Sequence, residues 1–178
     1  VHVLSVRNEC KELLFVVERE ADGREPSVRC INFGLDGMQS FSFTLEEERS
    51  AVLVPAGQVG TYLYEPNASV LKAGAFKQIA VRTGVKKLQV NSHLYTADHL
   101  VSDFPGRRFR VDEVLSFTGK LCKGLSKTIP QANITVRNFP LSVEELRKRT
   151  KITDGGHVYL FATTLVDGEK VLVKCSKA

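Results

Sequence analysis

The feature that most constrains the fold of this chain is a series of short apolar stretches that alternate with polar residues and stop at turn signals. Val1 to Arg7 and Lys11 to Glu18 alternate in this way around the polar turn Asn8-Glu9, which predicts a hairpin of half-buried strands. Another turn is predicted at Asp22-Gly23. Further extended segments are predicted at 27–33, 39–44, 51–54, 62–64 and 85–95, with a charged turn or short helix at 45–50.

A longer helix is predicted to interrupt these strands. It should begin after Pro66-Asn67 and end at Thr83-Gly84, because glycine is favoured just beyond a helix C-terminus. Between these signals apolar residues recur near helical spacing, at Val70, Leu71, Ala75, Ile79 and Ala80.

A different order of elements follows the break at Phe104-Pro105-Gly106. Ser142 and Glu145 form a capping box that should open a helix running to about Thr150. Asp167-Gly168 lies between two apolar stretches, which is a hairpin signal. Strands are predicted at 109–117, 132–138, 158–165 and 170–175, and helices at 118–126 and 142–150. The order is therefore β-α-β-α-β-β, and the fold class of the chain is α+β.

Charge is divided unevenly along the chain. Residues 101–178 carry fourteen Lys and Arg against eight Asp and Glu, a net charge of +6, whereas residues 1–100 carry eleven against twelve, a net charge of −1. An anionic partner should therefore contact the second half. No run of eighteen apolar residues occurs, so we expect no membrane-spanning segment.

The basic residues gather on the two helices predicted in the second half. Lys120, Lys123 and Lys127 recur at intervals of three and four and should form one stripe. On the following helix Leu146 should face inward, with basic residues around the rest. Such a surface can bind phosphates without reading sequence, although exposed basic residues often only solvate a helix.

The end of the strand before the second helix adds a further candidate. Arg137-Asn138-Phe139-Pro140 joins a cation, an amide and an aromatic ring, a combination that can contact RNA. The alternative is a strand end at which Phe139 packs against the following helix. The candidate RNA-binding residues are Lys120, Lys123, Lys127, Arg137, Arg147, Lys148 and Lys151.

Catalytic motifs are scarce in this sequence. The polar segment Asn91 to His99, with His93, Tyr95 and Asp98, is the one stretch that resembles an active-site loop, and its side chains could equally order that loop by hydrogen bonding. Neither a glycine-rich nucleotide loop nor a nucleophile elbow is recognisable, so we predict no catalytic, cofactor or metal site. The four cysteines, Cys10, Cys30, Cys122 and Cys175, contain no CxxC pair. We expect free thiols in a reducing cytoplasm, with a Cys10–Cys30 bridge as the alternative.

Several stretches together resemble one bacterial family. They are residues 3–14 (VLSVRNECKELL), 64–76 (YEPNASVLKAGAF), 104–107 (FPGR) and 137–140 (RNFP). They are similar to the C-terminal half of class I S-adenosylmethionine-dependent methyltransferases that end in a THUMP-like domain, and the likeness covers essentially the whole chain.

The resemblance implies three regions. Residues 1–63 would be a strand-rich region that includes the last hairpin of a truncated methyltransferase domain. Residues 64–107 would be a ferredoxin-like region, a fold name that implies no iron–sulfur cluster, and residues 108–178 a THUMP-like module. THUMP domains generally bind RNA in tRNA-modifying enzymes, so the resemblance and the charge division agree. Because the chain opens at Val1 within a strand pattern, the S-adenosylmethionine site and catalytic motif would lie upstream of it.

Three hypotheses follow. The first is a non-catalytic, cytoplasmic segment of an RNA methyltransferase that holds a tRNA or rRNA for its missing methyltransferase domain. The second is a structural or protein-interaction segment that braces that domain or a dimer; an exposed apolar edge on the first hairpin would favour it. The third is a small enzyme centred on His93, Tyr95, Asp98 and His99, which would require a pocket enclosing all four.

Overall fold

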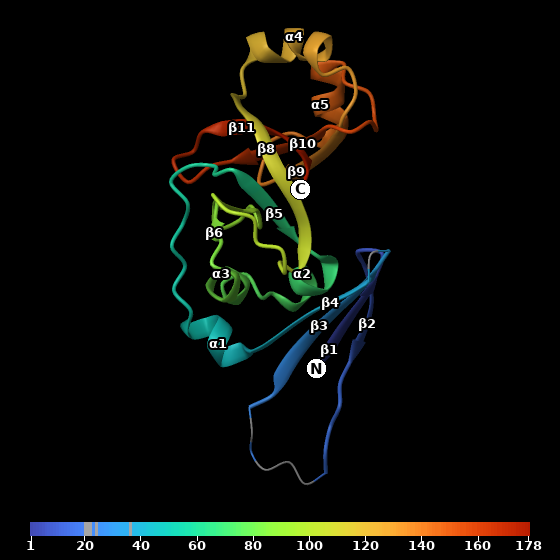
Figure 1. The fold of residues 1–178 in the computed structure, drawn as a ribbon, viewed down its shortest axis with the longest axis vertical. Helices are drawn as coiled ribbons and strands as arrows, with labels where there is room; N and C mark the ends of the chain where they lie inside the picture. The colour runs from blue at the N-terminus through green and yellow to red at the C-terminus, as the bar shows by residue number, and fades with distance from the viewer. Residues whose placement is uncertain (20–22, 24, 36) are drawn as a thin grey trace. The chain divides into compact units, whose positions relative to one another are not determined.

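The computed structural model describes residues 1–19, 23, 25–35 and 37–178, so the predicted turn at Asp22-Gly23 falls partly outside the described residues. The chain forms two compact units (Figure 1). The first unit contains Val1–Val54, Glu65–Val85 and Val101–Arg107, and the second contains Pro55–Tyr64, Lys86–Leu100 and Arg108–Ala178.

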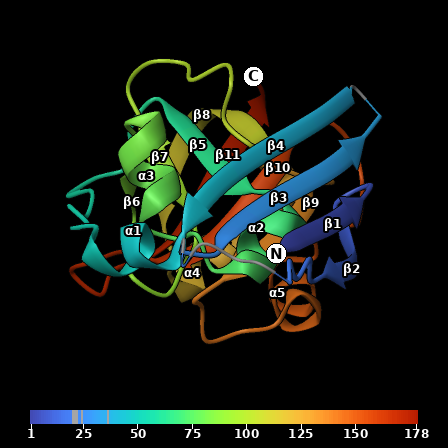
Figure 2. The same ribbon diagram turned by 90° about the horizontal axis from the view of Figure 1, so that it is seen from below.

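The first unit is built on a four-stranded sheet with the order β2-β1-β3-β4 (Figure 2). Its strands are β1 (His2–Val6), β2 (Glu9–Leu14), β3 (Ser27–Gly34) and β4 (Gly37–Thr44). β1 pairs antiparallel with β2 and parallel with β3, and β3 pairs antiparallel with β4. The first hairpin is confirmed, but its turn is Arg7-Asn8, at φ 51° and 62°, the backbone that a two-residue hairpin turn requires.

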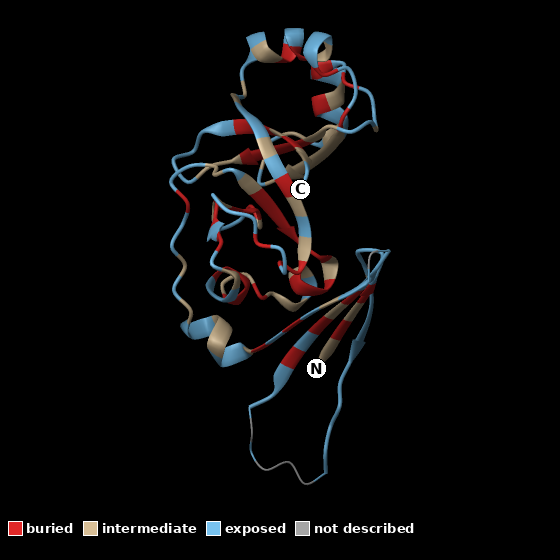
Figure 3. Ribbon diagram, viewed as in Figure 1, coloured by how far each residue is buried: buried red, intermediate tan, exposed pale blue. Residues whose placement is uncertain are grey.

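One face of this sheet forms the core of the first unit. Val3, Val28, Cys30, Phe41 and Phe43 are buried and alternate with more exposed neighbours along their strands (Figure 3). Helix α2 (Ala68–Ala73) packs against β1, β2 and β3. β2 ends at Leu14, four residues before the predicted end of its strand.

The predicted helix between Asn67 and Thr83 is wrong as one element, since it is two helices, α2 and α3 (Gln78–Thr83). Gly74 adopts φ 78° and its N–H donates to the Val70 carbonyl, which ends α2 in a left-handed cap. The segment 45–50 is a helix, α1 (Leu45–Ser50), opened by a capping box between Thr44 and Glu47. Residues 51–54 do not form the predicted strand.

A buried carboxylate, that of Glu65, contributes to the stability of the first unit. Glu65 is 2% exposed, and Arg107 donates its Nε–H to the Glu65 carboxylate at 2.8 Å. Nearby, the Asn67 side chain accepts from the Val70 amide at 3.1 Å and donates to Gln39 at 3.0 Å. These bonds satisfy polar groups that would be costly to bury alone.

The second unit is built on a seven-stranded sheet with the order β6-β7-β5-β8-β11-β10-β9. Its elements are β5 (Tyr62–Pro66), β6 (Lys86–Lys87), β7 (Tyr95–Ala97), β8 (Gly106–Ser116), α4 (Gly119–Thr128), β9 (Asn133–Arg137), α5 (Val143–Thr150), β10 (Tyr159–Thr164) and β11 (Lys170–Lys177). The continuous strand predicted at 85–95 is therefore wrong: two short strands flank a connection in which His93 has φ 52°. The order β8-α4-β9-α5-β10-β11 confirms the predicted β-α-β-α-β-β pattern and the α+β class.

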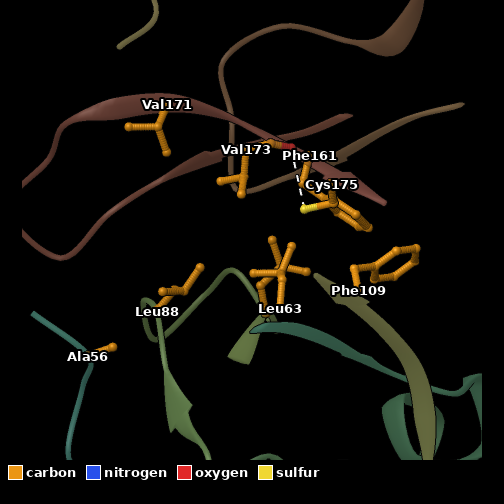
Figure 4. Close-up of a cluster of buried hydrophobic side chains, with 9 residues drawn as sticks. Ala56, Leu63, Leu88, Phe109, Phe161, Val171, Val173 and Cys175 are labelled. Atoms are coloured by element: carbon orange, nitrogen blue, oxygen red, sulfur yellow. Dashed lines mark hydrogen bonds between the residues drawn. The ribbon is translucent and has the colours of Figure 1, made fainter. Parts of the chain in front are cut away.

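Apolar side chains cover both faces of the central strands of this sheet. On one face Phe161, Val171 and Val173 pack with Leu63, Leu88 and other residues of the first half of the unit (Figure 4). On the other face Leu160, Ala162 and Leu172 pack with α4 and α5. The sheet thus separates two cores, and the helices lie on only one side of it.

Replacing Gly106 with alanine should destabilise the chain. An added Cβ would lie 2.1 Å from the Glu65 carbonyl oxygen and 2.8 Å from the Pro66 Cα, both of them backbone atoms that cannot easily move. We expect a loss of about 3 kcal/mol in the free energy of unfolding, measured by urea denaturation. In the matched change Gly124→Ala on α4, the added Cβ would have no neighbouring atom within 4 Å. This change should raise the free energy of unfolding by about 0.5 kcal/mol, because alanine favours a helix more than glycine does. Equal effects of the two changes would contradict this packing.

Candidate nucleic-acid interface

Helix α4 presents its lysines to solvent because its apolar residues anchor the opposite side. The Thr118 hydroxyl accepts from the Leu121 amide at 3.1 Å and opens the helix. Cys122 and Leu125 are buried against the core. Lys120, Lys123 and Lys127 are all exposed and lie on one stripe, as their spacing predicts.

Helix α5 carries basic residues at its C-terminal end. Its predicted capping box is present, with the Glu145 amide donating to the Ser142 hydroxyl at 3.2 Å and the Ser142 amide donating to Glu145 at 2.7 Å. The bond from the Ser142 amide holds the pKa of Glu145 below its usual range. Lys148 is exposed, and Lys151 follows the helix as an exposed C-cap at φ 62°.

The two helices are neighbours, so their basic residues belong to one layer. α4 and α5 contact each other along the same face of the sheet. Burial raises the pKa of the Cys122 thiol on α4, and the positive charge of Arg149 on α5 opposes that rise. We call the exposed set Lys120, Lys123, Lys127, Lys148, Arg149 and Lys151 the helix-layer basic surface.

Arg147 differs from the other candidates on α5 because its guanidinium is used inside the unit. It is 22% exposed and forms an ion pair with Asp154. It also donates to the carbonyls of Ile152 and Ala132, both at 3.3 Å. These bonds join the end of α5 to the segments on either side of it. Arg147 is therefore placed to hold the fold, whereas Lys148 and Lys151 face solvent.

Arg137 lies on the opposite side of the sheet from the helix layer. Ile134 and Val136 of β9 pack toward the helices, so the alternation of the strand places Arg137 on the other face. The structure therefore brings the α4 and α5 lysines together but does not bring Arg137 to them. Phe139 packs against Phe117 with ring centroids 4.9 Å apart, which supports a packing role for that ring.

The polar segment around His93 does not form one shared environment. Tyr95 is buried and His93 half-buried, whereas Asp98 and His99 are exposed. The Asp98 carboxylate accepts from the Thr61 amide at 3.4 Å, and the His99 carbonyl accepts from the Tyr64 hydroxyl at 2.9 Å. These bonds order the loop, which favours the structural alternative over an active site.

His93 nevertheless has an unusual electrostatic setting. The Lys87 ammonium lies 3.4 Å from the His93 Nδ1, although Lys87 is only 3% exposed. Burial, with the positive charges of Lys87 and Arg137, lowers the pKa of His93 to about 4. The imidazole is therefore neutral at physiological pH. The influence of Arg137 on His93 was not predicted, since nothing in the sequence relates two residues so far apart along the chain.

Neither metal binding nor thiol chemistry finds support in the described part of the chain. No group of three or more His, Cys, Asp and Glu side chains there could hold a metal ion. The four cysteines are free thiols, as predicted. Burial raises the pKa of Cys30 and of Cys175 to about 12, so both are unreactive core residues. No helix in the described ranges is long and apolar enough to cross a membrane.

Comparison with known proteins places two domains on this chain. Residues 62–105 match the family described as a ferredoxin-like domain, and residues 106–177 match the family described as THUMP domain-like. No curated protein matches the chain.

A solved structure, described as the crystal structure of a "putative methyltransferase" from Porphyromonas gingivalis W83, has the same fold, with 44% sequence identity and a TM-score of 0.91. The match covers 99% of this chain and 45% of that chain, so this chain spans less than half the length of the solved relative. The chain thus shares its fold with the P. gingivalis protein, and it contains a ferredoxin-like domain followed by a THUMP-like domain.

Proposed function

We propose that this chain is a non-catalytic, RNA-binding segment of a longer S-adenosylmethionine-dependent RNA methyltransferase. The observation that carries the proposal is the helix-layer basic surface, which lies on the THUMP-like domain. The P. gingivalis protein, which is described as a "putative methyltransferase" and is more than twice as long as this chain, supports the proposal further. Its sequence beyond this match is long enough for a separate catalytic domain.

The chemistry of the helix-layer basic surface fits contact with a nucleic-acid backbone. Lys120 and Lys127 are seven residues apart on α4, so their Cα atoms are separated by about 10.5 Å along the helix axis. Ammonium groups at such spacings neutralise phosphates and release counterions, which gives affinity that depends on salt and not on base sequence. The chain would then orient a tRNA or an rRNA, and another domain would select the base.

The proposal assigns S-adenosylmethionine to a domain outside this chain. Strand-to-helix connections here, such as β5–α2 and β9–α5, have no glycine-rich loop that would let the backbone approach a nucleotide. The transfer of the methyl group, the catalytic residues and a cytoplasmic location belong to the same proposal for the longer protein.

Removing the α4 stripe should weaken RNA binding. The triple change Lys120→Ala, Lys123→Ala and Lys127→Ala removes three exposed charges while keeping good helix formers, so the fold should be unaffected. We expect weaker affinity for bulk tRNA and a salt slope, log Kd against log salt, that falls by up to about three. The measurement is a binding isotherm across a salt series.

The matched control replaces three exposed lysines outside the helix layer, Lys86, Lys170 and Lys177, with alanine. Net charge falls by the same amount, so a general charge effect would weaken both variants equally. Equal weakening, or an unchanged salt slope in the α4 variant, would contradict a specific interface. Absence of tRNA binding by the unmodified chain at low salt would sink the proposal as a whole.

Arg147 should contribute to the stability of the fold, whereas its neighbour Lys148 should not. Arg147→Ala removes donors from two carbonyls and an ion pair, so we expect the free energy of unfolding to fall by about 2 kcal/mol. Lys148→Ala, one residue along on the exposed side of α5, should change stability by less than about 0.5 kcal/mol. Thermal or urea unfolding measures both. A destabilised Lys148 variant beside a stable Arg147 variant would reverse these assignments.

A second candidate function, protein interaction, is favoured by the end of β2 and the segment that follows it. Leu13 and Leu14 are 45% and 44% exposed, and Phe15, Val16 and Val17 are 70%, 67% and 88% exposed. β2 is also an edge strand of its sheet. Contiguous exposed apolar residues beside a strand edge are typical of a covered interface. We assign the covering element to the additional length of a protein such as the P. gingivalis relative.

If this apolar segment is an interface, its substitution should have one effect on the 178-residue chain and another on a longer protein. Phe15→Ser with Val17→Ser should reduce concentration-dependent association of the 178-residue chain, measured by sedimentation. In a longer protein that covers the segment, the same changes should lower the free energy of unfolding by roughly 2 kcal/mol per buried side chain. Unchanged stability in the longer protein would show that nothing covers this segment.

A further inference from the structure

The four-stranded sheet of the first unit carries apolar side chains on both of its faces. Val3 and Cys30 lie on the buried face, against which α2 packs. Because successive side chains of a strand point to opposite faces, five apolar residues of β1, β3 and β4 lie on the other face. They are Leu4, Val6, Ile31, Phe33 and Met38, and we call them the outer sheet face.

The register of the sheet makes the outer sheet face contiguous. In the parallel pair of β1 and β3, Leu4 stands beside Ile31 and Val6 beside Phe33. In the antiparallel pair of β3 and β4, Phe33 stands opposite Met38. Paired residues point to the same side of a sheet, so these side chains form one patch across three strands.

The outer sheet face is open to solvent in the 178-residue chain. Val6, Phe33 and Met38 are 41%, 46% and 59% exposed, whereas Val3 and Cys30 on the buried face are 2% and 0% exposed. The alternation of burial along these strands is visible in Figure 3. A contiguous apolar patch of this kind marks a surface that another structure covers.

Polar residues border the patch on both sides. Glu12 of β2 stands opposite Leu4, and Glu9 stands opposite Val6. On the other side, Ser40 of β4 stands opposite Ile31. An apolar centre with a polar rim is the usual composition of a protein interface.

The pairing of β1 with β3 indicates what kind of structure covers the patch. This pair is parallel, and parallel strands occur almost only in sheets that are covered on both faces, usually by helices. Helix α2 covers the buried face. A layer of helices on the outer sheet face would complete an arrangement in which the sheet lies between two helical layers.

We propose that the outer sheet face is the docking surface for the part of a longer protein that lies outside these 178 residues, and that this part covers it with the apolar sides of helices. The P. gingivalis relative, 44% identical over the match and more than twice as long as this chain, has the additional length that such a layer requires. The inference rests on the longer protein of the proposed function, but not on RNA binding. It concerns a face of the sheet, whereas the apolar residues 13–17 lie along and beyond its edge strand.

Docking and RNA binding would use different residues. The outer sheet face belongs to the first unit, and the helix-layer basic surface belongs to the second. Variants of one surface can therefore be made without altering the other.

The test measures the accessibility of the outer sheet face by thiol labelling. Cys10 is first replaced by serine, because it is half-buried whereas the other three cysteines are buried. Met38→Cys is then introduced into the 178-residue chain and into the longer protein, with Val166→Cys, at a position 51% exposed in the second unit, as the matched control. We expect maleimide to label Met38→Cys at least about tenfold more slowly in the longer protein, because a covered thiol is not accessible to the reagent. Val166→Cys should react at the same rate in both.

A charge on the patch should have an effect only where the patch is covered. Met38→Lys remains exposed to water in the 178-residue chain, so the urea concentration at its unfolding midpoint should not change. In the longer protein the same lysine would be buried without a partner, so we expect a lower midpoint. Val166→Lys should leave the midpoint unchanged in both proteins.

The outcomes separate this inference from the proposed function. Equal labelling of Met38→Cys in the two proteins, or an unchanged midpoint of the longer protein with Met38→Lys, would overturn the docking surface. Protection of Met38→Cys that increases with the concentration of the 178-residue chain would identify a second copy as the occupant and overturn the assignment to the longer protein. Protection in a longer protein that does not bind tRNA at low salt would support the docking surface while refuting the proposed RNA binding.

Discussion

Burial of β10 and β11 on both faces is the constraint on which the second unit depends. Leu160 and Phe161 are adjacent in sequence yet belong to different cores, since successive side chains of a strand point to opposite sides. A strand that is apolar on both faces must be covered on both. The helices α4 and α5 cover one face, and the segments around β5, β6 and β7 cover the other.

Burial on both faces also determines on which side of the second unit each basic side chain lies. The helix layer buries Cys122, Leu125 and Leu146, which leaves the lysines of α4 and α5 on its outer side. β9 is the edge strand of the same sheet, and its alternation sends Arg137 to the face without helices. The two faces of the unit therefore differ: exposed cations lie on the helix side, and half-buried Arg137 lies on the other, beside buried Thr163 in the strand register. The helix side is the one suited to attraction of a polyanion.

The first unit has a different balance of buried and exposed surface. One face of its sheet is buried, and its polar residues, such as Glu65 with Arg107, are satisfied within the unit. Phe15 to Val17 remain exposed beyond an edge strand. In a protein twice as long, such a segment is a natural contact for additional structure, which is why interaction remains the second candidate function beside RNA binding.

The sequence by itself determined the local structure: the first hairpin, the capping box of α5, the β-α-β-α-β-β order and the lysine stripe of α4 all depend on neighbours a few residues apart. The prediction from sequence was wrong where an apolar periodicity continued across a helix end. At Gly74 the left-handed backbone divides one periodic stretch into two helices. Only the tertiary structure decided that Arg147 holds its own unit together while Lys148 faces solvent, and that Arg137 lies beside Thr163 on the face away from the lysines. The physical reason is that hydrogen bonding and charge act through space, and strand pairing brings together residues whose separation along the chain carries no signal of their contact.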